Sequence, residues 1–109
     1  MSEIEKLKSE VLTKRAIRLT LEERKRQKIL FGDQTHLPLP ILYLIVAEER
    51  GELAEAILVT ELDGHHPERG GLDNLLKEAV QSAATSIKMV EAILLKFEKE
   101  EDDNDKNKP

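Results

Sequence analysis

Four carboxylates fall within two turns of one aliphatic stretch of the chain, residues 40–61. This stretch, PILYLIVAEERGELAEAILVTE, has the length and the residue spacing of a single helix. At about 100° per residue, Glu48, Glu52 and Glu55 lie within an arc of about 60°. Glu49 lies about 60° beyond Glu52. The acids therefore gather on one side of the expected helix.

No opposite charge follows these acids at the helical spacing of four residues, where a solvated acidic helix would normally carry lysine or arginine. The residues four positions on are Glu52, Leu53, Ala56 and Val59. Carboxylates that converge from an apolar helix face commonly hold a hard divalent cation, because such cations prefer oxygen ligands. The pattern therefore predicts a metal site on this helix.

Length and composition favour one small all-α domain. The chain has 109 residues, is rich in helix-forming residue types and contains only 3% aromatic residues. A net charge of −5 argues against nucleic acid as the main partner, and the lack of cysteine excludes disulfides and thiolate metal sites. The longest apolar run, residues 41–47, is too short to span a bilayer, and no signal peptide is evident. We expect a cytoplasmic protein without a membrane partner.

The first helical segment is expected over residues 2–31. Thr20 and Glu23 match a capping box, so this segment is predicted to be either two helices or one kinked helix. Gly32 is a suitable residue to end it. A loop then runs to Pro40, which can serve as the first residue of the acidic helix.

The last helix is expected over about residues 72–99. Gly51, inside the acidic helix, suggests close approach by another helix or by a ligand. Residues 1–97 are predicted to form the single domain, and the charged residues 98–109 a disordered tail. The expected buried stripe of the last helix comprises Leu72, Leu76, Ala79, Val80, Ala83, Ile87, Val90 and Leu94.

Three helical segments with one apolar stripe each do not easily close a compact core. The acidic helix is apolar over too much of its circumference for two neighbours to cover it. We therefore expect a helical bundle completed by oligomerisation, as a homodimer or a homotetramer.

The last helix offers partners for the acidic cluster. Glu78 and Gln81 are three residues apart and share a face. Together with Glu49 and Glu52 they would give a cation three carboxylates and one amide oxygen, a set suited to Mg²⁺, with Mn²⁺ as an alternative. The same polar strip holds Lys77, Thr85 and Lys88, so a solvent-exposed face explains Glu78 and Gln81 equally well.

Four short motifs follow one another along residues 20–95. EERGEL at residues 48–53 matches an EExxE pattern, and EAVQ at residues 78–81 lies where ExxD would complete it. Upstream, ERKRQ at residues 23–27 and FGDQTH at residues 31–36 match ERxRQ and (W/F)GxQxH. In this order the motifs resemble the all-α NTP pyrophosphatases of the MazG-like superfamily, in particular its small members.

The resemblance implies a Mg²⁺-dependent nucleoside triphosphate pyrophosphohydrolase, which converts a (d)NTP to the monophosphate and pyrophosphate. The catalytic residues it implies are Glu48, Glu49, Glu52 and Glu78. The implied metal ligands are Glu49, Glu52, Glu78 and Gln81, and the implied substrate contacts are Arg24, Gln27, Gln34 and His36. Glu48 could hold a second cation or orient the attacking water.

Gln81 departs from the family pattern, which has aspartate at this place. A neutral amide is a weaker ligand for a cation than a carboxylate, so this residue leaves two alternatives open. One is a non-catalytic or weakened helical assembly protein that keeps the MazG-like fold. The other is an activity like that of a phosphoribosyl-ATP pyrophosphohydrolase, a branch that shares the acidic helix.

The histidines at positions 65 and 66 are not expected to bind a metal ion. Adjacent side chains in a loop before Pro67 rarely ligate one ion together, and no ExxH spacing is present. The loop over residues 62–71 is instead expected to close over the substrate.

Overall fold

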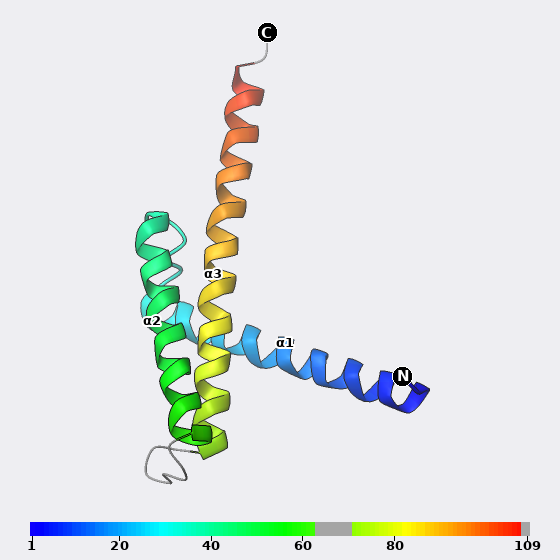
Figure 1. The fold of residues 1–109 in the computed structure, drawn as a ribbon. Helices are drawn as coiled ribbons and strands as arrows, with labels where there is room; N and C mark the ends of the chain where they lie inside the picture. Colours follow the sequence, from blue (N-terminus) through cyan, green and yellow to red (C-terminus); the bar gives the residue numbers. More distant parts are fainter. Residues whose placement is uncertain (63–70, 108–109) are drawn as a thin grey trace.

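The computed structural model describes residues 1–62 and 71–107, and every regular element in this part of the chain is helical (Figure 1). The elements are α1 (Glu3–Phe31), α2 (Leu39–Ile57), the π-helix η1 (Leu58–Leu62) and α3 (Gly71–Lys106). The described residues contain no strand. The expectation of an all-α chain is therefore confirmed.

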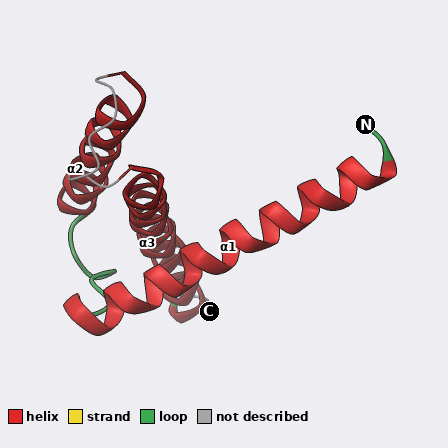
Figure 2. Cartoon of the chain, turned by 90° about the horizontal axis from the view of Figure 1, so that it is seen from below, coloured by secondary structure: helices red, strands yellow, loops and turns green. Residues whose placement is uncertain are grey.

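The helices form an elongated molecule that measures 65 × 39 × 23 Å. α2 and α3 lie side by side and run in opposite directions, and α3 also packs against α1 (Figure 1). α1 crosses the pair, and its N-terminal half projects away from the other helices (Figure 2). α3 is thus the element that holds the other two helices together.

α1 is one uninterrupted helix, so the predicted break near Thr20 is wrong. The Thr20 hydroxyl donates a hydrogen bond to the Ala16 carbonyl, at 2.8 Å, as threonine can do inside a helix. The N-terminal cap is Ser2, whose side chain accepts from the Glu5 N–H. Gly32 ends the helix as predicted. Its φ of 78° is left-handed, and its N–H donates to the Lys28 carbonyl.

α2 begins at Leu39, one residue before the proline that was expected to start it. The inward-facing side of α2 is a seam, a row of residues spaced three and four positions apart. Leu42, Val46 and Ala56 are buried on this seam, and Leu53 is half-buried. Glu49 takes the remaining position of the repeat, between Val46 and Leu53, and is half-buried as well.

α3 extends to Lys106, beyond the expected end near residue 99. In the structure, residues 98–106 of the expected disordered tail continue this helix. Oppositely charged residues four apart, such as Asp102 and Lys106, support a helix on an exposed surface.

The buried side of α3 is not the predicted aliphatic stripe. Leu72 is 73% exposed, Leu76, Val90 and Leu94 are each more than half exposed, and the remaining predicted members are half-buried. Small or polar side chains face the neighbouring helices instead, because they allow the helices to pack closely. The buried residues of α3 are Ser82, Ala84, Thr85, Lys88 and Ala92.

The core of a single chain is small. Leu42 is the one large side chain that is fully buried among the described residues. Large apolar side chains such as Ile4, Leu7 and Val11 are exposed on the projecting half of α1. Gly51 is exposed too, and a Cβ placed on it would meet nothing within 4 Å, so the close approach expected there is not found among the described residues.

None of the described helices combines the length with the hydropathy that crossing a bilayer requires.

Candidate functional site

Three of the four predicted metal ligands come together between α2 and α3. Glu49 and Glu52 lie three residues apart on α2, and a carboxylate of Glu78 on the antiparallel α3 lies close to both of them. One carboxylate oxygen from each lies within 4.8 Å of the other two. Hard divalent cations take oxygen ligands of this kind, and the open positions of their coordination shell can be filled by water or phosphate.

Two of these carboxylates carry a buried oxygen that no group in the described residues satisfies. These atoms are Oε2 of Glu49 and Oε2 of Glu78. Because a buried polar atom without a partner costs free energy, native proteins rarely contain one without a reason. A cation bound between the helices would satisfy both oxygens, so the residues present fit such an ion.

The electrostatics of the cluster favour protons when no cation is bound. Burial is the main cause that raises the pKa of Glu49, followed by the negative charges of Glu52, Glu78 and Glu48. Burial likewise raises the pKa of Glu78, with further increases from the charge of Glu52 and from a hydrogen bond between the two carboxyl groups. Lys77 partly opposes this rise. The cluster is therefore a region of uncompensated negative charge.

An open depression of about 470 Å³ lies beside the cluster and would admit a ligand to it. Its lining combines acidic groups of α2 and α3 with an amide from α3 and one aliphatic side chain each from α2 and η1. The lining residues are Glu52, Glu55, Ala56, Val59, Asn74 and Glu78.

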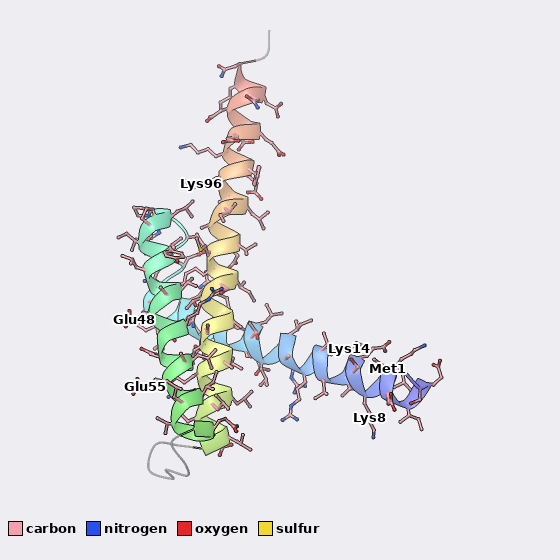
Figure 3. All side chains as sticks on the ribbon, viewed as in Figure 1. Met1, Lys8, Lys14, Glu48, Glu55 and Lys96 are labelled. Carbon is pink, nitrogen blue, oxygen red and sulfur yellow. The ribbon has the colours of Figure 1, made fainter. Side chains whose placement is uncertain are left out.

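Two further residues predicted to belong to the site, Glu48 on α2 and Gln81 on α3, lie at the edge of this arrangement. Glu48 is exposed and projects from the side of α2 that faces away from α3, with Glu55 two turns further along the helix (Figure 3). Gln81 lies one turn after Glu78 on α3 and is half-buried. The site therefore centres on Glu49, Glu52 and Glu78.

The predicted phosphate contact Arg24 is a buried residue that joins α1 to α3. The residue is only 3% exposed. Nε donates to Oε1 of Glu91 at 2.6 Å, and Nη2 donates to the carbonyl and to Oδ1 of Asp33, at 3.0 and 3.2 Å. Nη1 is buried and has no hydrogen-bond partner in the described residues. Arg24 thus has two carboxylate partners and one NH₂ group, Nη1, without a partner among the described residues.

The other three predicted substrate contacts differ in burial. Gln27 is buried, donates to Glu23, and leaves its own Oε1 without a partner in the described part of the chain. Gln34 lies in the loop between α1 and α2 and has a φ of 63°, which is uncommon for a residue with a side chain. His36 is exposed in the same loop.

Lys88 is a residue of this region whose burial was not predicted from the sequence. It was placed on a solvent-exposed strip, yet it is only 3% exposed. Its Nζ donates to Oε1 of Gln34 at 2.7 Å. Burial and the nearby charge of Arg24 lower the pKa of Lys88, whereas Glu49 acts in the opposite direction. Lys88 therefore lies within electrostatic range of both Arg24 and the acidic cluster.

The one sequence signal for the burial of Lys88 is its spacing from Thr85 and Ala92, three and four residues away. This spacing indicates an interface with another helix only when the helix that packs against this face is already known.

The histidines and the arginine of the predicted substrate loop, His65, His66 and Arg69, lie outside the described residues.

Comparison with known proteins assigns no family to the chain: no family model, no curated protein and no solved structure matches it. The candidate site consequently rests on the geometry of the chain's own residues.

Proposed function

We propose that this chain is a Mg²⁺-dependent nucleoside triphosphate pyrophosphohydrolase of the MazG-like type, which produces a (d)NMP and pyrophosphate. The observation that carries the proposal is the convergence of Glu49, Glu52 and Glu78 from two helices to within 4.8 Å. The unsatisfied buried oxygens of Glu49 and Glu78 support a cation as the missing partner. The motif resemblance supplies the reaction class.

The residues of the cluster would share the chemistry unequally. Glu49 and Glu78 are the half-buried members and would hold the cation between the helices, whereas Glu52 is exposed and faces the depression where a ligand would enter. A bound Mg²⁺ would bind phosphate oxygens and offset the charge that develops on them. Glu48 remains a proposed site for a second cation or for orienting water, and its position on the outer side of α2 separates it from the other three.

Pyrophosphate release tests this proposal. We expect the protein with Mg²⁺ or Mn²⁺ to release pyrophosphate from at least one member of a panel of NTPs, dNTPs and phosphoribosyl-ATP. Glu49→Gln and Glu52→Gln should each lower the rate by about 100-fold or more, because each removes a charged ligand of the cation. Circular dichroism should show unchanged helix content.

Glu61→Gln is the matched control, because Glu61 is an exposed acid of the adjoining π-helix that lies outside the cluster. Normal turnover by both cluster variants would mean that the acids are not the catalytic site. No release by the wild-type protein from any substrate would mean that the chain is not an enzyme of this class.

We further infer that the chain associates with copies of itself, as a homodimer or a homotetramer. The support is the small core together with the exposed aliphatic residues of α3 and of the projecting half of α1. Light scattering after size-exclusion chromatography should give a mass of two or four chains. A monomer at micromolar concentration would contradict the inference.

A non-catalytic assembly protein is the second candidate. Gln81 in place of aspartate favours it, because an amide weakens the metal site, and the exposed apolar residues would serve assembly alone. An oligomer that binds Mg²⁺ but releases no pyrophosphate would favour this candidate over the enzyme.

A further inference from the structure

Two helix segments carry rows of large apolar side chains that the described residues leave exposed. The α1 arm, residues 3–18, projects to one side of the molecule, and the α3 arm, residues 90–106, extends past α2 in another direction (Figure 1). Members of each row are three and four residues apart and so share one helix face. Five of the six members are more than half exposed, so both faces lack a partner among the described residues. The rows are Ile4, Leu7 and Val11 on the α1 arm, and Val90, Ile93 and Phe97 on the α3 arm.

Each apolar row is followed by two charges, and the sign of these charges is opposite on the two arms. On the α1 arm, Lys14 and Arg15 lie three and four residues after the last apolar member of the row. On the α3 arm, Glu100 and Glu101 lie three and four residues after the last member. All four are exposed, and none has an ion-pair partner among the described residues. The two arms are therefore equal in spacing and complementary in charge.

The two arms of one chain cannot cover each other, because they diverge from the place where α1 crosses α3 (Figure 1). Their equal spacing and opposite charges instead fit the α1 arm of one copy to the α3 arm of another copy. An anionic membrane or a nucleic acid would match the cations of the α1 arm, but it would leave the acids and the apolar row of the α3 arm uncovered. A second copy accounts for both arms, so it is the occupant that the observations favour.

The order of apolar and charged residues decides the direction in which the arms pair. Along both arms the apolar row comes first and the charges follow. Parallel arms therefore bring row against row and the cations against the acids. Antiparallel arms that aligned the same rows would place the cations and the acids at opposite ends of the contact, where neither has a counter-charge. The pattern thus favours the parallel direction.

We propose that the α1 arm of one copy packs parallel to the α3 arm of the next copy, with Ile4 beside Val90 and the two cations beside the two acids. The inference rests on the self-association inferred above, and it does not depend on the enzymatic activity. It adds the surfaces in contact, their direction and their register.

The parallel direction also decides between the two oligomers. Along the chain, the α1 arm runs towards the crossing of the helices and the α3 arm runs away from it (Figure 1). Each contact therefore places the crossing of the next copy at the far end of the α3 arm, so copies follow one another head to tail and two copies cannot close. Such heterologous contacts form a ring when the rotation closes. The contact consequently requires the homotetramer rather than the homodimer.

Charge reversal tests the contact through the mass of the assembly, measured by light scattering after size-exclusion chromatography. One double variant is Lys14→Glu with Arg15→Glu, and the other is Glu100→Lys with Glu101→Lys. Each places like charges across the contact, so its mass should fall from four chains to one. An equal mixture of the two should regain the mass of four chains, because each variant then supplies the charges that match the other. Recovery in the mixture also shows that both variants fold.

The matched control is Asp102→Lys with Asp103→Lys. It changes the net charge by the same amount as the reversal of the two glutamates, but at positions on other faces of the α3 arm. Its mass should remain that of four chains.

Disulfide cross-linking tests the direction of pairing, because the chain has no cysteine of its own. Under mild oxidation, a chain with Ile4→Cys and Val90→Cys should form covalent oligomers on a non-reducing gel. A chain with Ile4→Cys and Phe97→Cys should not, because only antiparallel arms would bring these two positions together. Cross-linking of the second pair in place of the first would overturn the parallel direction.

The inference and the proposed function fail in different ways. A wild-type monomer or dimer would overturn the contact, and so would a monomer that binds vesicles of anionic lipid through Lys14 and Arg15. A tetramer that survives both charge reversals, or a mixture that does not regain the mass of four chains, would keep or leave self-association to other surfaces and overturn this contact. A tetramer that follows all the expected results but releases no pyrophosphate would support the contact while the enzymatic proposal fails.

Discussion

Two places along α3 hold charge in opposite ways. At the acidic end, near the start of α3, Glu78 converges with Glu49 and Glu52 of α2, with no cation bonded to any of them in the described structure. At the paired end, further along α3, Glu91 is bonded to Arg24 of α1, which is also bonded to Asp33. The acidic end has charge without a bonded partner, and the paired end has charge that is largely paired.

This difference separates groups that stabilise the fold from groups that are available to a ligand. Paired charges such as Arg24 and Glu91 connect helices, so removing one of them leaves the other without its partner. Like charges held close together destabilise the free protein, and we propose that a bound cation compensates them here. Substitutions at the two places, and changes in pH and Mg²⁺ concentration, test this distinction.

Breaking the paired end should cost the most stability. Arg24→Met leaves Glu91 and Asp33 without their buried partner, and we expect a loss of about 2–3 kcal/mol in the free energy of unfolding. This lies below the cost for a fully buried pair because the Glu91 side chain is 34% exposed. Urea unfolding followed by circular dichroism measures the effect.

The matched control for Arg24 is Arg26, on the same helix. Arg26 pairs with Glu23 on the surface, so Arg26→Met should change stability little. Equal losses of stability in Arg24→Met and Arg26→Met would contradict the claim that the buried pair contributes more stability than the surface pair.

The contribution of the acidic end to stability should change with pH in the opposite direction to that of an ordinary ion pair. Because the pKa values of Glu49 and Glu78 are raised, the folded protein holds these protons more tightly than the unfolded chain does. Their contribution to stability is therefore full below the ordinary carboxyl pKa and is lost as the pH rises through the raised values. Urea unfolding in EDTA between about pH 5 and 8 should show this decline.

Addition of Mg²⁺ should counteract the decline, because cation and protons compete for the same oxygens. Stabilisation by Mg²⁺ should consequently grow with pH, and Glu49→Gln should flatten both trends. A Mg²⁺ effect that is independent of pH would place the cation elsewhere.

Gln81→Asp tests whether the cation shell extends to the next turn of α3. A fourth carboxylate should tighten Mg²⁺ binding by about tenfold, equivalent to about 1.4 kcal/mol of added stability when Mg²⁺ is in excess. The measurement is the shift of Tm on adding Mg²⁺, with Gln81→Ala as the control. An unchanged shift would mean that Gln81 lies outside the shell.

The smallest effect is expected at Gly51, which lies beside the acidic cluster in sequence but not in contact with it. Because a Cβ there meets nothing within 4 Å, Gly51→Ala should raise the free energy of unfolding by about 0.5–1 kcal/mol. Pyrophosphate release should not change. A more stable variant with lost activity would show that a ligand or a second copy of the chain uses the space at Gly51.

The acidic cluster could be predicted in outline only from two signals together. Helical spacing offered Glu78 as a partner for Glu49 and Glu52 but explained it equally well by a solvent-exposed face. The motif resemblance favoured a site, and the structure brings one oxygen of each of the three residues within 4.8 Å of the other two.

The packing of α3 could not be predicted in the same way. Leu72 and Leu94 follow an apolar period but are exposed in the single chain, whereas Thr85 and Lys88 are buried. The buried side depends on which helices pack against α3, and small residues such as Ala84 allow close packing without any apolar signal. The role of Thr20 was also ambiguous, because its hydroxyl can cap a helix or bond within one.

Direct measurement of cation binding tests the central claim most simply. Isothermal titration calorimetry of the metal-free protein with Mg²⁺ and Mn²⁺ should show a site in the wild-type chain that Glu49→Gln and Glu78→Gln each abolish, while Glu61→Gln retains it. Wild-type protein that binds neither cation at millimolar concentration, or binding that survives both substitutions, would contradict the claim that these acids form a metal site.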